Sequence, residues 1–147
     1  HSVDGVALRL GAIYGPRRTT TCLIRRLITD GLAGQTTRLP HGAGHYRQYT
    51  FYDDAADGIL AALDRPDLPL AAYNITGGSW LTVEEIGRVV ASVVPGVRLE
   101  VGQAPFPHDR LTGPLDIRAA ARDFGYRPKT PLAEGVRQYA DWLRAQI

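Results

Sequence analysis

Short apolar runs punctuate the chain and predict its strands. The run Val6–Leu10 lies between two glycines and is typical of a buried strand, as is Ala71–Ile75. A third strand is predicted at Val97–Val101, and the aromatic residues of Tyr49–Tyr52 favour extended structure. Buried strands of this kind belong to parallel sheets and need parallel neighbours. We expect the neighbours of the first two strands to lie outside this chain.

Five segments carry apolar side chains at helical spacing. The predicted helices follow the threonines at 19–21 and begin at Asp53 and Asp54, Thr82, Asp116 and Thr130. Thr82 and Glu85 have the spacing of a capping box, in which each side chain binds the other residue's backbone N–H. In the second helix we expect Ala56, Ile59, Leu60 and Leu63 to form the buried side.

Two segments differ from this pattern. Residues 37–48 are rich in glycine, histidine and proline. Residues 102–114 contain several prolines and no periodicity, so they are expected to form a long loop. Strand and helix patterns otherwise alternate along the chain. This order predicts the α/β class.

Composition narrows the class of protein. The chain has 147 residues, 44% hydrophobic, a formal charge of +2 and one cysteine. One cysteine cannot form an internal disulfide, and no apolar stretch reaches the roughly 18 residues of a membrane span. The arginines are scattered among acids, which argues against nucleic-acid binding. We expect a cytoplasmic protein with no membrane or nucleic-acid partner.

Four motifs in a fixed order carry a family resemblance. They are VALRLGAIYGP, RQYTFYDDAADGILAAL, AAYNITGGSWLTVEEIG and DIRAAARDFGYRPKTPLAEGVRQYADWL. Together they resemble the C-terminal half of extended short-chain dehydrogenases, the NAD-dependent epimerase/dehydratase family, over nearly the whole chain. The resemblance implies the C-terminal part of a Rossmann-type doubly wound fold with a small substrate-binding lobe. Residues 1–147 would then be one half of an enzyme whose dinucleotide-binding half is missing.

The catalytic motifs of that family are absent from this sequence. No Gly-x-x-Gly-x-x-Gly follows an N-terminal strand, and the only lysine, Lys129, has no tyrosine four residues before it. We therefore assign no catalytic residue here. The resemblance implies that NAD or NADP binds mainly to the missing half, which is the expected partner, together with a small sugar or hydroxy substrate and a second copy of the chain.

The resemblance also implies cofactor contacts after the first strand. RLGAIYGP matches the family pattern Arg-x-x-Asn-x-Tyr-Gly-Pro, a loop that passes the nicotinamide, so Leu10, Gly11, Ile13 and Tyr14 are the candidates. Glycine and proline could equally serve only to turn the chain. Ala12 occupies the asparagine position and has no side-chain donor for a substrate diphosphate.

Candidate substrate residues are Arg47, Ala12, His45 and Phe106. Arg47 matches the arginine of the family Arg-Asp-Tyr motif, and its guanidinium suits an oxyanion; Gln48 replaces the aspartate, so a local ion pair is lost. Phe106 replaces an arginine that holds the nucleotide in the family. Because positions 12 and 106 both lack the side chain that would bind a nucleotide, a sugar acid, a polyol or a small hydroxy compound becomes the expected substrate.

Other reactive side chains have plainer interpretations. His41, His45 and His108 are irregularly spaced and lack further ligands, so no metal site is predicted. Cys22 is interpreted as a core residue, and Asp53 and Asp54 as a structural helix start.

Two functions remain open. The chain is either the substrate-binding portion of an NAD(P)-dependent sugar epimerase, dehydratase or related dehydrogenase, inactive alone, or a stand-alone binding module derived from the same fold. A missing half encoded beside this chain would favour the first.

Overall fold

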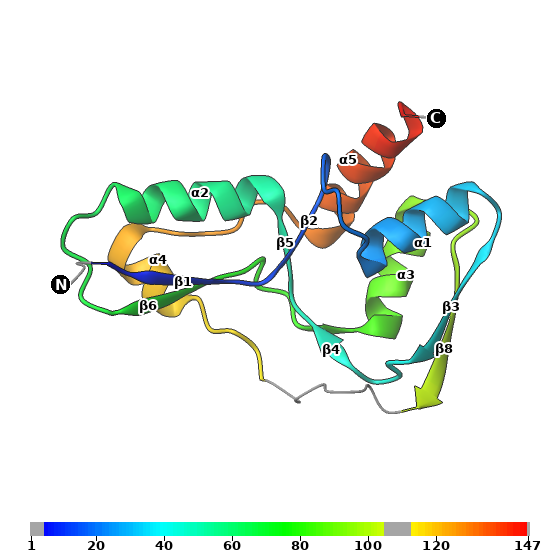
Figure 1. The fold of residues 1–147 in the computed structure, drawn as a ribbon, viewed down its shortest axis with the longest axis horizontal. Coiled ribbons are helices and arrows are strands. Elements are labelled where there is room, and N and C mark those ends of the chain that lie inside the picture. Colours follow the sequence, from blue (N-terminus) through cyan, green and yellow to red (C-terminus); the bar gives the residue numbers. More distant parts are fainter. Residues whose placement is uncertain (1–4, 105–112, 147) are drawn as a thin grey trace.

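A computed structural model describes residues 5–104 and 113–146. The elements in chain order are β1 (Ala7–Leu10), β2 (Ala12–Tyr14), α1 (Leu23–Leu32), β3 (Thr36–His41), β4 (Tyr46–Arg47), β5 (Tyr49–Phe51), α2 (Tyr52–Leu63), β6 (Ala72–Ile75), β7 (Leu81–Thr82), α3 (Val83–Val93), β8 (Arg98–Ala104), α4 (Arg118–Phe124) and α5 (Leu132–Arg144). The molecule is elongated, with α2, α4, β1 and β6 at one end and α1, α3, β3 and β8 at the other (Figure 1).

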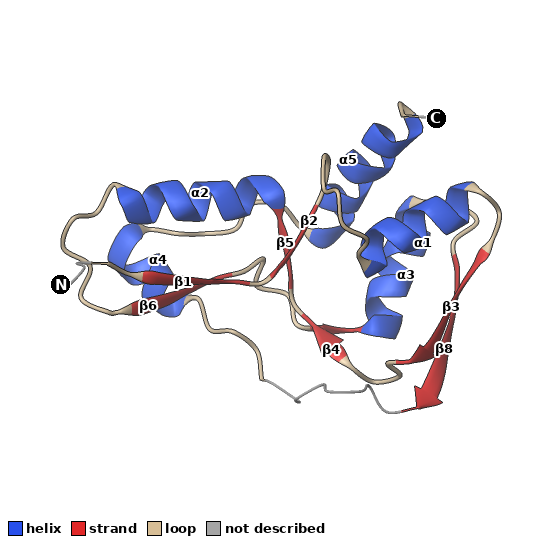
Figure 2. Ribbon diagram, viewed as in Figure 1, coloured by secondary structure: helices blue, strands red, loops and turns tan. Residues whose placement is uncertain are grey.

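The strands pair two by two. Three pairs are parallel, β1 with β6, β2 with β5 and β3 with β8, and β4 pairs with β7 in the antiparallel sense. The segment formed by β1 and β2 pairs first with β6 and then with β5, and so connects the two ends of the molecule (Figure 2). The α/β class with parallel strands is confirmed.

Each end of the molecule has its own apolar core. The larger core lies among α1, α3 and α5, and its buried members are Tyr14, Ile24, Leu27, Ile28, Phe51, Ile86, Val90, Val94, Val136, Tyr139, Ala140 and Leu143. The smaller core lies between β6, α4 and the end of α2, and comprises Ala62, Tyr73, Ile75, Ala120, Phe124 and Tyr126. The chain thus folds around two cores joined by β2 and β5.

The expectation for the first two strands is partly wrong. β1 and β6 are each other's parallel neighbours, so one neighbour of each lies within the chain. β6 is buried through Tyr73 and Ile75, as predicted. β1 is instead largely exposed, and Leu10 is 39% exposed, because no described element covers its outer side.

The predicted buried side of α2 is also wrong. The buried residues are Asp54, Ala55, Gly58 and Ala62, whereas Leu60 and Leu63 are 59% and 73% exposed. Small side chains face inward because the helix approaches β6 closely: a Cβ on Gly58 would lie 2.7 Å from Cγ2 of Ile75. The large apolar side chains are left on the outside.

Pairing between distant residues forms strands that no local pattern predicted. β3 and β4 form within residues 36–47, because β3 pairs with β8 about 60 residues later in the chain and β4 pairs with β7. The strand predicted at Val97–Val101 is confirmed and continues to Ala104. The rest of the predicted 102–114 loop lies largely outside the described residues.

Some helix ends follow local signals. The capping box of Thr82 and Glu85 is present, and Gly125 ends α4 in the left-handed conformation with φ 73°. The prediction that Asp116 caps α4 is wrong: Ile117 is at the cap position, and Asp116, one residue earlier, accepts the Arg118 N–H at 2.9 Å. The predicted threonine caps of α1 and α5 are wrong: Cys22 Sγ accepts the Arg25 N–H, and α5 follows Pro131 with no side-chain cap.

Apolar residues of α5 that recur at helical spacing are buried. Val136, Tyr139 and Ala140 are fully enclosed in the larger core, and Leu143 is nearly so. Apolar periodicity is enough to identify this face, because the helix packs with one side on α3 and α1.

Candidate substrate and cofactor site

Three segments meet at Gly11, between β1 and β2. The Gly11 N–H donates to Ile75 O at 3.0 Å, and the Ala12 N–H donates to Gln48 O at 3.1 Å. A Cβ on Gly11 would lie 2.8 Å from Oγ1 of Thr50, so glycine is required for this close approach. The carboxyl ends of β1 and β6 meet here, which is where parallel sheets bind ligands.

The four predicted cofactor residues differ in what they expose. Leu10 is exposed, Gly11 and Ile13 are half-buried, and the Ile13 carbonyl accepts a hydrogen bond from Arg18 Nη1. Tyr14 is 1% exposed, and its hydroxyl donates to Leu132 O at 3.4 Å. Burial raises the pKa of the Tyr14 phenol above its ordinary value. The Tyr14 ring therefore belongs to the core, and only its backbone remains for a cofactor contact.

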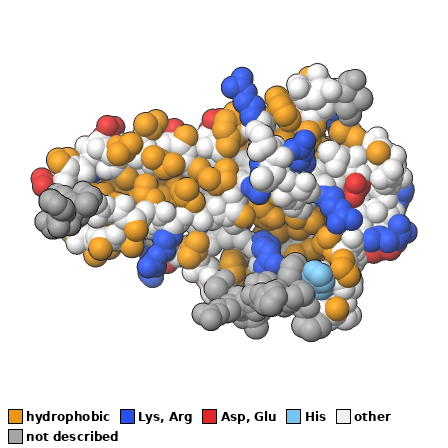
Figure 3. All heavy atoms as spheres, in the orientation of Figure 1, with side chains coloured by type: hydrophobic (Ala, Val, Ile, Leu, Met, Phe, Trp, Pro, Cys, Tyr) orange, Lys and Arg blue, Asp and Glu red, His pale blue; other side chains and the backbone are white. Residues whose placement is uncertain are grey.

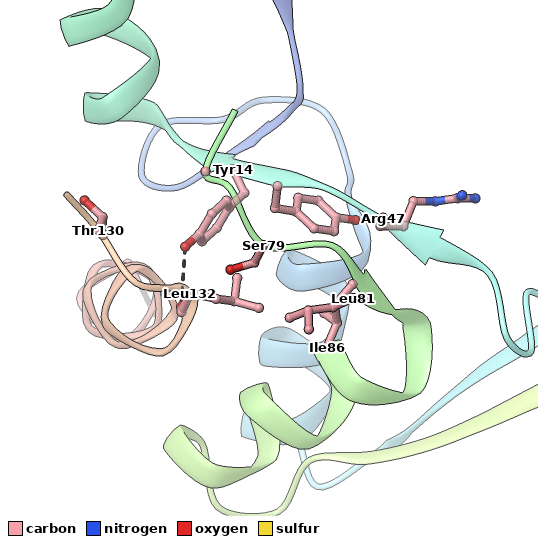
Figure 4. A pocket seen from close by; sticks show the side chains of 9 residues that line it. Tyr14, Arg47, Ser79, Leu81, Ile86, Thr130 and Leu132 are labelled. Atoms are coloured by element: carbon pink, nitrogen blue, oxygen red, sulfur yellow. Dashed lines mark hydrogen bonds between the residues drawn. The ribbon is translucent and has the colours of Figure 1, made fainter. Parts of the chain in front are cut away.

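Figure 4 shows the small cavity around the Tyr14 hydroxyl. Its volume is about 10 Å³, close to the lower limit for one water molecule. Ser79, Thr130 and Leu132 line it beside the phenol, and the Arg47 guanidinium points away from this cluster. The cavity is too small for a sugar, so the room for a substrate lies elsewhere.

A larger cavity, of about 240 Å³, lies beside Arg47. It is lined by Thr21, Cys22, Leu23, Arg26, Leu39, Arg47, Tyr49 and Val83. Arg47 Nη1 donates to Tyr46 O at 3.0 Å, which directs the side chain along β4. Burial raises the pKa of Tyr49 to about 12, so its phenol is neutral at physiological pH. This cavity has two arginines among apolar and aromatic residues, and one of them, Arg26, is paired with Asp30 at 3.6 Å.

The remaining predicted substrate residues are not all gathered at this cavity. Ala12 is exposed at the start of β2. The His45 backbone connects β4 to α3, because its carbonyl accepts the Val83 N–H at 2.9 Å. Phe106 lies outside the described residues, so its predicted contact stays a prediction.

Gln48 has a role that the sequence did not reveal. Its side chain is 7% exposed and binds the backbone of Leu115 twice: Oε1 accepts the Leu115 N–H at 2.8 Å and Nε2 donates to Leu115 O at 3.3 Å. The two residues are 67 positions apart, and no local pattern connects them. Position 48, where the resemblance led us to expect an aspartate, thus makes a pair of long-range backbone hydrogen bonds.

Asp54 has the structural role that was predicted, by a different contact. Its carboxylate is buried, with the residue 2% exposed, and accepts the Lys129 N–H at 2.8 Å and the Thr130 N–H at 3.1 Å. These bonds fix the chain just before α5 against α2. Asp54 is thus not available to a substrate.

The described residues hold no cluster of metal ligands. Within 5–104 and 113–146, no three His, Cys, Asp or Glu side chains gather as metal ligands. In the same part of the chain, no helix is long and apolar enough to cross a bilayer. Cys22 packs against the larger core, as predicted, but it also lines the cavity beside Arg47.

Comparisons with known proteins agree on one family. The model of the NAD dependent epimerase/dehydratase family matches residues 1–76. A dTDP-glucose 4,6-dehydratase of Streptomyces antibioticus is 28% identical over 98% of this chain and 43% of its own length. UDP-glucuronate 4-epimerase 2 of Arabidopsis thaliana is 27% identical over 92% of this chain and 35% of its own length.

A solved structure has the same fold. The UDP-glucuronic acid 4-epimerase of Bacillus cereus, in complex with UDP-glucuronic acid and NAD, superposes with a TM-score of 0.84 at 22% identity. The match covers 97% of this chain and 46% of that one. The chain therefore spans less than half the length of these relatives.

Proposed function

The chain belongs to the NAD dependent epimerase/dehydratase family, and we propose that it is the substrate-binding portion of an NAD(P)-dependent sugar epimerase, dehydratase or related dehydrogenase. It spans 35% to 46% of the relatives described above. Its sequence lacks Tyr-x-x-x-Lys, because Gly125 stands four residues before its only lysine. The portion is therefore inactive alone and needs a second half for hydride transfer.

Arg47 is the residue on which the substrate assignment depends. Arg26 and Arg47 both line the 240 Å³ cavity, Arg26 in an ion pair with Asp30 at 3.6 Å, and a guanidinium such as that of Arg47 suits an anionic ligand. Ala12, which is exposed, offers no side-chain donor for a diphosphate. We therefore favour a substrate with one compact anionic group, such as a sugar acid, over a nucleotide sugar.

The residues after β1 fit one end of a nicotinamide cofactor. Leu10 and Ala12 present exposed apolar side chains on either side of Gly11, at the carboxyl end of β1, where a flat ring can pack. The cofactor supplies the hydride chemistry when bound. This portion would contact the nicotinamide, and the loop that binds the cofactor's diphosphate would belong to the other half.

The second half has a surface on which to dock. Figure 3 shows hydrophobic side chains gathered over the end of the molecule that carries α2 and β1. Leu60 and Leu63 of α2 and Leu10 of β1 are exposed, and Leu63 lines a groove of about 500 Å³ between β1, α2 and the loop before β6. An exposed strand edge beside an apolar groove favours an added strand. We propose that the second half covers this surface.

Binding and turnover by the isolated chain test this function. Glucuronate should bind to the wild-type chain in calorimetry, and Arg47→Ala should weaken binding by roughly tenfold or more, because a charged hydrogen bond is removed. Arg137→Ala is the matched control, since Arg137 is paired with Glu134 on the surface of α5. The isolated chain with NAD should transfer no hydride.

Three outcomes separate the alternatives. Hydride transfer by the isolated chain would contradict the fragment assignment. Equal affinity in the Arg47 and Arg137 variants would contradict the proposed site. UDP-glucuronate binding much more tightly than glucuronate would overturn the sugar-acid preference and favour a nucleotide sugar.

A further inference from the structure

Gln48 lies in the chain between two residues that line the cavity, Arg47 and Tyr49, and contacts two further segments. It follows Arg47 directly in the chain, its carbonyl accepts the Ala12 N–H at 3.1 Å, and its side chain holds Leu115. Three segments that are distant in sequence are therefore fixed at one buried residue. Gln48 is almost completely shielded from solvent.

The amide of Gln48 is suited to this contact in a way that a carboxylate is not. A backbone unit offers one N–H donor and one C=O acceptor, and only a side-chain amide presents the matching acceptor and donor together. An ionised aspartate or glutamate would accept the Leu115 N–H but repel its carbonyl. The residue type at position 48 thus determines whether both hydrogen bonds to Leu115 form.

A second amide strengthens the same attachment. Asn74 Nδ2 of β6 donates to Asp116 O at 2.8 Å. Leu115 and Asp116 are therefore held by two side chains, one from β6 and one from the residue between β4 and β5. Successive side chains of an extended chain leave on opposite sides, so Gln48 is anchored behind the strand while Arg47 faces the other way.

We propose that Gln48 is a positioning residue for the anionic substrate: by holding Leu115 it fixes the backbone from which Arg47 extends. This inference rests on the proposed function, because Arg47 must be the substrate's partner. Gln48 itself touches no ligand. Its removal should leave the guanidinium present but poorly directed.

Hydrogen exchange and affinity together test the proposal. In Gln48→Ala, the Leu115 amide should exchange roughly tenfold faster or more, because its acceptor is removed. The Val94 amide, bonded to Val90 O at 2.8 Å in the larger core, should keep its protection and so report an intact fold. Glucuronate affinity should fall several-fold, and Gln138→Ala, at an exposed glutamine of α5, should change neither measurement.

Two further variants give readouts that simple destabilisation would not produce. Gln48→Ala should add little to the loss already caused by Arg47→Ala, because both act through one guanidinium. Gln48→Glu should protect Leu115 poorly at neutral pH and better in acid, where a protonated carboxyl can donate and accept.

The failures are distinguishable. If Leu115 loses protection but glucuronate affinity is unchanged while Arg47→Ala weakens it, the positioning role is wrong and the proposed function stands. If the wild-type chain binds no glucuronate and no UDP-glucuronate, the proposed function is wrong and the positioning role falls with it. Additive losses in the double variant would also overturn the role of Gln48.

Discussion

Arg17 has a left-handed backbone conformation, which is unfavourable for a residue with a side chain. It has φ 64° in the turn Gly15–Arg18, which the Arg18 N–H closes on Gly15 O at 3.4 Å. The left-handed region costs a non-glycine residue roughly 1–2 kcal/mol. Part of the gain from glycine is offset by its greater freedom in the unfolded chain, roughly 0.5–1 kcal/mol.

We expect Arg17→Gly to stabilise the chain by about 0.5 kcal/mol. Urea denaturation measures the change, and Arg17→Ala is the control, since alanine keeps the backbone penalty. The Ala variant should resemble wild type, because the Arg17 side chain is exposed and its contacts are dispensable. A Gly variant no more stable than the Ala variant would show that the turn is unstrained.

What could be predicted for single residues depended on how far away their partners lie. The glycine and proline of the Gly15–Arg18 turn marked it from sequence, and Asp54 was recognised as structural. The partners of Asp54 and Gln48, 75 and 67 residues away, could not be found in any local pattern. The hydrogen-bond partners of these two side chains were therefore found only from the fold.

At the scale of elements, α3 has the clearest local determinant. The Thr82 hydroxyl accepts the Glu85 N–H at 3.1 Å, and the Glu85 carboxylate accepts the Thr82 N–H at 2.8 Å. Replacing such a cap by alanine costs about 1 kcal/mol. Because α3 carries Ile86 and Val90 into the larger core, loss of its first turn should be felt by the whole fold.

We expect Thr82→Ala to lower the free energy of unfolding by about 1 kcal/mol and Thr82→Ser to leave it nearly unchanged. Chemical denaturation followed by circular dichroism measures both. Glu85→Ala should also destabilise, and the double variant should lose less than the sum, since each partner supports the other. Additive losses, or a serine variant as weak as alanine, would mean that the two bonds do not act as a unit.

The difference between local signals and distant partners also explains which elements could be predicted. α3, the end of α4 and the inner face of α5 were signalled by capping residues and 3.6-residue periodicity. β3 exists only because β8 lies beside it, and the inner face of α2 was set by close packing on β6. Hydrophobic periodicity pointed to Leu60 and Leu63, which face outward at the surface proposed for the second half.

At the scale of the whole molecule, ionised carboxyl groups at both ends of the fold make its stability depend on pH. Hydrogen bonds from Arg122 and Tyr73 lower the pKa of Asp123, and a hydrogen bond from Arg118 lowers that of Asp116. The Thr82 N–H lowers the pKa of Glu85 in the same direction. The smaller core and α3 thus both depend on ionised carboxyl groups.

Acid should therefore destabilise the chain. A carboxyl whose pKa is lower in the folded state favours folding while it is ionised, and this contribution is lost as pH falls below the ordinary value of about 4 through the folded pKa. The urea midpoint should be nearly constant between about pH 5 and 7 and fall steadily below about pH 4. Asp123→Asn tests one group: it should be less stable than wild type near neutrality, and the difference should shrink in acid as Asp123 takes up its proton. A difference that stays constant with pH would assign the stabilisation to the shape of the Asp123 side chain, held by Tyr73 at 2.7 Å, and remove charge from its cause.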